Sequence, residues 1–265
     1  MTLRRQSWFK IISLTLVFLV MFYMIPPVPQ LEAWYRATHS NVFDSALDYL
    51  AYNSDWNVTE SEREFFRDIL NDDYLRQSLH NGSAAADAGS KLDHHLYFET
   101  DGSPYTEEHY NAADSADRYY TQALDMLEDA SNQDELKDAL FMLGKALHFV
   151  EDVGSFPHVL PNSPDPDLIG SISTSIHGNY ESWVDYNFST LLADADQFYT
   201  AVPKDAEDAV IDVATHTMFS GNSKTEAGSK EAYGAIWMSL YYNTKKEEFK
   251  TGTRNALVNT IQDLR

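Results

Sequence analysis

The spacing of apolar positions predicts helices along most of the chain. Between residues 134 and 153 the apolar residues recur every three or four positions and form one stripe along a helix: Leu136, Leu140, Leu143, Leu147 and Val150. Asn132 or Asp134 can cap this helix. The segment 58–70 opens with Thr59 and Glu62, the spacing of a capping box, and continues with an apolar face.

The same periodicity indicates further helices at 40–53, 107–129, 178–195, 206–219, 229–243 and 252–263. Strand-like alternation is scarce, and no repeat period is evident. Glycine, asparagine and proline mark two long loops, at 81–103 and 154–170. The chain of 265 residues is 43% apolar, which is enough to bury one sizeable core. We therefore predict an all-α fold, a single-domain multi-helix bundle that spans residues 34–265.

The N-terminus has the pattern of an export signal. Basic residues at Arg4, Arg5 and Lys10 precede the apolar run 11–25, and Ala33 offers a small residue for cleavage. We expect residues 1–33 to be a signal peptide and the protein to be secreted or periplasmic. The alternative is an uncleaved membrane anchor on the outer side of the membrane, because residues 8–25 come close to spanning length.

Charge and cysteine content narrow the chemistry. The net charge of −22 disfavours nucleic acid as a partner, because proteins that bind phosphate backbones normally offer lysine and arginine. Metal ions could supply that positive charge, so nucleic acid is not excluded. The chain has no cysteine, and a metal site here would have to use histidine, aspartate and glutamate.

One predicted helix carries metal-ligating residues at helical spacing. His148 and Asp152 lie four positions apart, so both side chains emerge on one face and can reach a common ion. Gly144 lies one turn earlier on that face and leaves room for another backbone or an ion. His158 follows Pro157 just beyond the helix. His177 and Glu181 repeat the four-residue spacing at the start of the next helix.

Each pair also has an ordinary structural interpretation. A single buried histidine is more often a hydrogen-bonded core residue than a ligand. Two pairs are harder to dismiss, because a buried cluster of histidines and carboxylates without metal would leave several polar groups unsatisfied. Nitrogen and oxygen donors without sulfur suit Zn²⁺.

The run LGKALHFVEDVGSFPH, which ends at His158, resembles the signature of the zinc-dependent phospholipases C and their relatives, the S1/P1-type nucleases. The resemblance extends from Trp34 to about residue 243, and it implies the helical bundle of that superfamily. In that superfamily the mature chain begins with a tryptophan that binds zinc together with a nearby histidine. Trp34 and His39 match this pattern.

The resemblance also implies an aspartate and a histidine in the region 81–103. The stretch NGSAAADAGSKLDHHLYF supplies Asp87 and, from the Leu-Tyr that follows it, His95. His94 is the competing choice.

The resemblance implies three zinc ions, and processing would complete the site of the third. The first would bind Asp87, His95, His148 and Asp152; the second His158, His177 and Glu181; and the third Trp34 and His39, with Asp152 as a bridge. An α-amine binds metal only where it exists and is deprotonated, and its ordinary pKa is about 7.7–8.0. Cleavage after Ala33 would therefore complete the third site, and the uncleaved chain should lack that ion.

By the same resemblance we expect an exported phospholipase C, which hydrolyses the glycerol-side phosphodiester of a phospholipid at a membrane surface to diacylglycerol and a phosphorylated headgroup. A metal-bound hydroxide would attack phosphorus. The resemblance implies that Asp87 orients or deprotonates the attacking water. We expect a monomer.

The spacing His-x-x-Tyr-Glu at 177–181 is similar to the phospholipase branch. Ala88, Leu92 and Leu96 replace the aromatic residues that select choline or bases in the two branches, so the headgroup stays open. Two other functions stay in play: a zinc nuclease or other phosphodiesterase, and a non-catalytic, membrane-anchored helical protein whose histidines only bind metal or pack.

Overall fold

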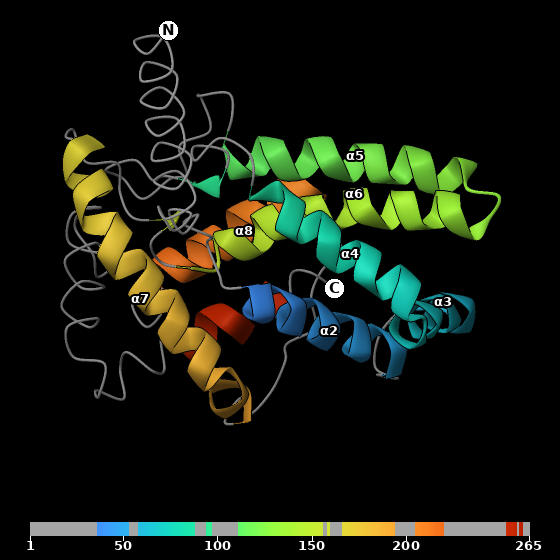
Figure 1. The fold of residues 1–265 in the computed structure, drawn as a ribbon, viewed down its shortest axis with the longest axis horizontal. Coiled ribbons are helices and arrows are strands. Elements are labelled where there is room, and N and C mark those ends of the chain that lie inside the picture. The colour runs from blue at the N-terminus through green and yellow to red at the C-terminus, as the bar shows by residue number, and fades with distance from the viewer. Residues whose placement is uncertain are drawn as a thin grey trace, which may run out of the picture. The chain divides into compact units, whose positions relative to one another are not determined.

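The computed structural model describes residues 36–52, 58–87, 94–96, 111–155, 158–159, 166–193, 205–219, 253–258 and 260–261. The elements in these ranges are helices (Figure 1): α2 (Arg36–Tyr52), α3 (Glu60–Asn71), α4 (Asp73–Ala86), α5 (Ala112–Asp129), α6 (Gln133–Asp152), α7 (Pro166–Ala193) and α8 (Ala206–Phe219). No strand occurs within these ranges. The predicted all-α class is therefore confirmed for this part of the chain.

The chain divides into two compact units, Met1–Leu31 and Glu32–Arg265, and the residues that the structure describes all belong to the second. The predicted signal peptide, with its alternative as an anchor, lies outside them, as do Trp34 and the predicted helix at 229–243. Over the described ranges, no helix combines the length and the apolar character needed to cross a bilayer.

Helix α6 is the centre of the fold, because it packs against both α4 and α5. A short turn at residues 130–132 joins α5 to α6, and the two helices run side by side (Figure 1). The Asn132 side chain accepts a hydrogen bond from the backbone N–H of Glu135 at 3.0 Å, so Asn132 rather than Asp134 caps α6. The capping box predicted from Thr59 and Glu62 is present at the start of α3.

The predicted start of the loop at 81–103 is wrong, because helix α4 continues to Ala86. The turn signal of Asn81 and Gly82 does not end the helix, and packing supplies the reason. A Cβ atom on Gly82 would lie 2.0 Å from the backbone oxygen of Phe141 in α6, and one on Gly144 would lie 2.1 Å from that of Leu79 in α4. The two glycines therefore let the α4 and α6 backbones touch. The space left by Gly144 is filled by another backbone.

The predicted end of the loop at 154–170 is also wrong, because helix α7 begins at Pro166 and not near residue 178. Proline is favourable in the first turn of a helix, where its missing N–H has no partner to lose. Helix α8 matches the predicted 206–219, and residues 253–258 and 260–261 are helical within the predicted 252–263.

Two apolar clusters meet along α6. Phe149 and Val150 belong to a cluster with the alanines at the start of α5 and the buried face of α8. Leu140 and the partly buried Leu147 belong to a second cluster with Phe43, Ile69, Leu75 and Leu79. His148 stands in the chain between Leu147 of one cluster and Phe149 of the other, and it is fully buried.

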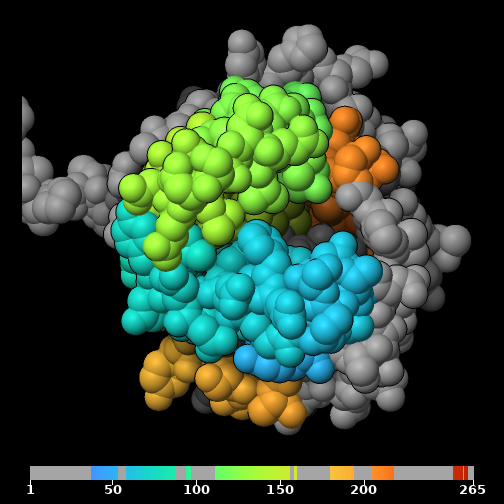
Figure 2. Space-filling model, turned by 90° about the vertical axis from the view of Figure 1, so that its right-hand side faces the viewer, coloured from blue at the N-terminus to red at the C-terminus, as the bar shows by residue number. Residues whose placement is uncertain are grey.

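The surface is hollowed between α3 and the start of α6 (Figure 2). A cavity of about 360 Å³ lies there, lined by Phe65, Asp68, Ile69, Asn71, Asp72, Leu75 and Leu136.

Candidate metal centre

The last turns of α6 bury three polar side chains, His148, Glu151 and Asp152, and each is 0% exposed. The four-residue spacing predicted to bring His148 and Asp152 together does so: Nε2 of the histidine lies 3.1 Å from Oδ2 of the aspartate. Gly144, one turn earlier, holds α4 close to this face. Helix α6 therefore presents an imidazole and two carboxylates to the interior.

Helix α4 orients His148. The Ser83 hydroxyl is hydrogen-bonded to Nδ1 of His148 at 3.2 Å. This contact directs Nε2 toward Asp152 and toward Asp87, whose Oδ1 lies 3.4 Å away. Asp87 follows the last residue of α4. The ring nitrogen that faces the carboxylates is thus Nε2.

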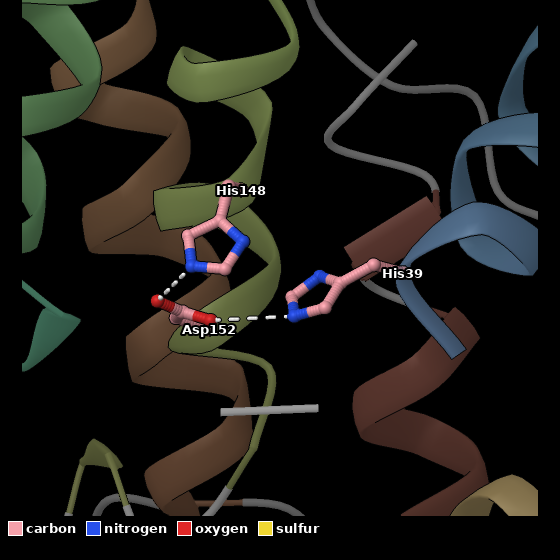
Figure 3. A group of neighbouring side chains, drawn as sticks. All are labelled: His39, His148 and Asp152. Atoms are coloured by element: carbon pink, nitrogen blue, oxygen red, sulfur yellow. Dashed lines mark ion pairs between the residues drawn. The ribbon is translucent and has the colours of Figure 1, made fainter. Parts of the chain in front are cut away.

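Helix α2 brings His39 to the same place. Its ring stacks on that of His148, with the ring centres 4.5 Å apart and the planes at 28°. Nε2 of His39 lies 3.7 Å from Oδ1 of Asp152, so the carboxylate of Asp152 lies beside the two stacked rings and faces each of them with one oxygen (Figure 3). Asp152 is thus close to both histidines, and its role as a bridge between two ions stays a prediction.

Of the two adjacent histidines, His94 is the one that enters this cluster. Its Nδ1 lies 2.5 Å from Oδ2 of Asp152 and 3.3 Å from Nε2 of His148. The ring of His95 instead stacks on that of His158, with the centres 4.5 Å apart. The geometry therefore favours His94, the competing choice, over His95 as the companion of Asp87 and His148.

The backbone explains this choice. The N–H of Leu96 donates to the carbonyl of His158, and the N–H of Ala112 donates to that of His95. His158 donates from Nδ1 to the carbonyl of His94 at 2.6 Å. These hydrogen bonds hold the backbone of residues 94–96 in place. The side chains of His94 and His95 therefore point in different directions. The sequence carries no signal of this register, because the pairing partners are far away in the chain.

The structure describes two of the three side chains predicted to hold the second ion, those of His158 and Glu181. His158 and Glu181 are both buried, at 2% exposure. Helix α7 keeps His177 and Glu181 one turn apart, but the His177 side chain lies outside the described residues, as does Trp34. Thr38 in α2 donates to Asp185 of α7 at 3.0 Å. This bond ties α7 to α2 directly beside His39, one helical turn beyond Glu181.

Two sets of side chains can each hold a cation among the described residues: His39, His148 and Asp152, and Asp87, His94 and His148. Three of their buried atoms have no hydrogen-bond partner in this part of the chain, namely Nε2 of His39, Oδ2 of Asp87 and Oδ1 of Asp152. Buried polar atoms of this kind are costly unless something binds them. Imidazole and carboxylate are zinc donors, with bonds of about 2.0–2.2 Å. The donor set fits zinc.

The charges in the cluster are arranged for a cation. Burial alone would lower the pKa of His148, but Asp152 and Asp87 outweigh it and raise that pKa to about 10. Burial alone would raise the pKa of Asp152, but His148 and His94 hold it well below its usual range. Burial, with a contribution from His148, lowers the pKa of His39. The carboxylates thus favour positive charge at the point where the histidines converge.

Glu151 belongs to the site and was missed by the sequence reasoning. Its Oε2 is hydrogen-bonded to Nδ1 of His39, and burial together with Asp152 raises its pKa well above the usual range. One signal could have found it. Glu151 lies four positions after Leu147, where the apolar stripe of α6 continues, and a carboxylate at a stripe position calls for a buried partner.

A cavity of about 210 Å³ reaches the cluster from between α2 and α4. Its lining is polar except for one alanine: His39, Ser40, Gln77, His80, Asn81, Ser83, Ala84 and Asp87. The cavity therefore connects two of the cluster's side chains, His39 and Asp87, with a polar surface of α4.

Comparison with known proteins places the chain in a family. The family model described as zinc dependent phospholipase C matches residues 70–243. The alpha toxin from Clostridium absonum is a similar solved structure, at 16% identity and a TM-score of 0.46; the match covers 86% of this chain and 63% of the toxin. A search of curated proteins found no match. Because the family model spans most of the chain, the protein belongs to the zinc-dependent phospholipase C family.

Proposed function

We propose that the protein is an exported zinc-dependent phospholipase C. The observation that carries this function is the convergence of His39, Asp87, His94, His148 and Asp152 from α2, α4, α6 and the segment 94–96, with three buried donor atoms that lack hydrogen-bond partners among the described residues. Such a set is expensive to bury without a cation. Membership of the family supports zinc as that cation.

Three zinc ions are proposed, with ligands from each part of the site. The first would be held by Asp87, His94, His148 and Asp152; the second by His158, His177 and Glu181; and the third by Trp34 and His39, with Asp152 shared. When bound, zinc supplies Lewis acidity toward phosphoryl oxygens and lowers the pKa of water to about 7, which provides the hydroxide for attack on phosphorus.

The side chains around the cluster have separate tasks. The Ser83 hydroxyl fixes the His148 ring, so that Nε2 faces Asp152 and Asp87. The two oxygens of Asp152 face different histidines, His39 on one side and His148 on the other. Asp87 lines the polar cavity, and its buried Oδ2 has no hydrogen-bond partner among the described residues, which supports a role in orienting or deprotonating the attacking water. We assign Asp87 as the general base on this ground.

The proposed substrate is a phospholipid at a membrane surface. Water adds to phosphorus, the bond between phosphorus and the glycerol oxygen breaks, and that oxygen takes a proton, which leaves diacylglycerol and a phosphorylated headgroup. The net charge of −22 and the spacing His-x-x-Tyr-Glu favour lipid over nucleic acid. The polar lining of the cavity suits the hydrated headgroup side of a phosphodiester.

The deciding experiment compares two substrates with one preparation. The mature chain, 34–265, is loaded with zinc and incubated with phosphatidylcholine vesicles and, separately, with single-stranded DNA. Release of diacylglycerol and phosphocholine without cleavage of DNA supports the proposal. Cleavage of DNA alone would make the protein a nuclease, and turnover of neither, with zinc bound, would favour a non-catalytic role.

We propose that export and metal loading are linked. Removal of residues 1–33 creates the amine of Trp34, and that amine is the donor needed beside His39. The mature chain should therefore bind one zinc ion more than the chain that keeps residues 1–33, as measured by elemental analysis after dialysis. Equal zinc content in the two chains would refute this link. We further propose that the mature chain acts as a monomer outside the cytoplasm.

A further inference from the structure

The geometry points to Glu151 as a positioning residue for the zinc site: it holds Nδ1–H of His39 and thereby turns Nε2 of that ring toward Asp152. This inference rests on the zinc site proposed above. Glu151 is not one of the nine ligands expected from the sequence. Its proposed task is to orient a ligand and not to bind zinc.

Two neighbouring carboxylates reach opposite edges of one imidazole. Oε2 of Glu151 is hydrogen-bonded to Nδ1 of His39, and Oδ1 of Asp152 lies 3.7 Å from Nε2 of the same ring. Both carboxylates are 0% exposed, and His39 is 3% exposed. The ring is therefore held by one residue and directed at the other, although the two are consecutive in α6.

The two ring nitrogens cannot exchange these tasks. A neutral imidazole carries one N–H donor and one lone pair, and a metal takes the lone pair. The short contact to Glu151 occupies Nδ1, whereas Nε2 has no hydrogen-bond partner in the described part of the chain. Nε2 is thus the atom left for the ion, and Nδ1 carries the proton that it donates to Glu151.

The alternative role for Glu151, as a direct ligand, has less support. The carboxylate oxygen nearest to the ring is engaged by Nδ1, and the two candidate cation groups among the described residues do not include Glu151. A carboxylate that accepts from the far side of a ligating imidazole fixes its orientation and makes it a stronger donor.

The test uses Glu151→Ala and Glu151→Gln in the mature chain, with Glu128→Gln at an exposed position of α5 as the control. Zinc number and affinity are measured by competition with a chromophoric chelator. Glu151→Ala removes the acceptor, and we expect the zinc ion held by His39 to bind about 10- to 100-fold less tightly. In Glu151→Gln the amide oxygen still accepts from Nδ1–H, so the loss should be smaller. The control should bind as the wild type does.

A second measurement needs no variant at position 151. In the zinc-loaded wild type, long-range ¹H–¹⁵N spectra report the tautomer of His39, assigned with His39→Gln. The Nδ1–H form is expected. An Nε2–H form, or wild-type zinc affinity in a folded Glu151→Ala variant, would overturn the inference; if the alanine variant does not fold, the glutamine variant and the tautomer decide.

These results separate the inference from the proposed activity. Weakened zinc binding in the alanine variant together with no turnover of any phosphodiester by the wild type would leave Glu151 as a positioning residue in a non-catalytic zinc protein. Full activity in the wild type together with unchanged zinc affinity in the alanine variant would keep the phospholipase and remove the role of Glu151.

Discussion

Oδ1 of Asp152 lies 3.7 Å from Nε2 of His39, and its other oxygen lies 3.1 Å from Nε2 of His148. One carboxylate thus joins a helix from the start of the described chain to the helix at its centre. The distance to His39 is too long for a hydrogen bond, but it suits two atoms that bond to a common zinc ion at about 2.0–2.2 Å each.

Because Asp152 is proposed to be shared by two zinc ions, we expect it to be the most sensitive residue of the site. In Asp152→Asn we expect phosphodiester hydrolysis to fall by about 100-fold or more, because loss of a ligand should exceed the 10- to 100-fold effect of outer contacts. Initial rates at saturating zinc measure this. Asp138→Asn, at an exposed position of the same helix, is the control and should keep full activity. Unchanged hydrolysis in Asp152→Asn would exclude the shared ligand.

His94 and His95 can be told apart by zinc content. Since His94 contacts Asp152 and His148 while His95 stacks on His158, His94→Ala should lose about one zinc ion per chain at limiting zinc. His95→Ala should keep the ion of the Asp87 group. Elemental analysis after gel filtration gives the numbers. The reverse result would restore His95 as the ligand.

The contact between α4 and α6 depends on two glycines. In Gly82→Ala or Gly144→Ala the new Cβ would meet a backbone oxygen at 2.0 or 2.1 Å, which no rotamer can relieve. We expect each substitution to lower the free energy of unfolding by about 1–3 kcal/mol or more. Urea titrations of the zinc-free protein measure it, with Asn81→Ala on the exposed face of α4 as the control. Wild-type stability in both glycine variants would show that the helices are not in close contact.

Asp44, which is not one of the proposed zinc ligands, should make the free energy of unfolding depend on pH. Burial alone would raise the pKa of Asp44, but hydrogen bonds with His80 and Arg76 outweigh it and lower that pKa. A lowered folded-state pKa contributes stability above the unfolded value of about 3.9, and the contribution is lost as the pH falls through the folded value. Zinc-free wild type and Asp44→Asn should therefore differ most in unfolding free energy near neutral pH and converge in acid. A constant difference across that range would contradict this linkage.

Zinc should stabilise the folded chain, because ligands that converge only in the native state bind there alone. Free zinc at about 100 times its dissociation constant should add about 2.7 kcal/mol for one site. Thermal unfolding with and without a chelator tests this, and excess zinc should reverse the effect. Magnesium serves as the control, since it prefers oxygen donors and octahedral geometry. Equal melting temperatures with and without chelator would count against a structural cation.

Local patterns sufficed for much of the fold. The stripe of α6, the capping box at Thr59 and the bounds of α8 follow from spacing alone, because a helix makes its hydrogen bonds within itself. The same logic placed His148 and Asp152 on one face before any packing was known. The extension of α4 through Gly82 did not follow, since its cause is the backbone of α6.

The sequence by itself determined the helical class, the residue types suited to zinc and the pairs that share a helix, because each depends on neighbours a few positions apart. Only the tertiary structure decided that His94 faces Asp152 while His95 stacks on His158, and that Glu151 holds His39. Those outcomes depend on contacts between segments distant in the chain, and burial and hydrogen bonding select one register that no local periodicity encodes.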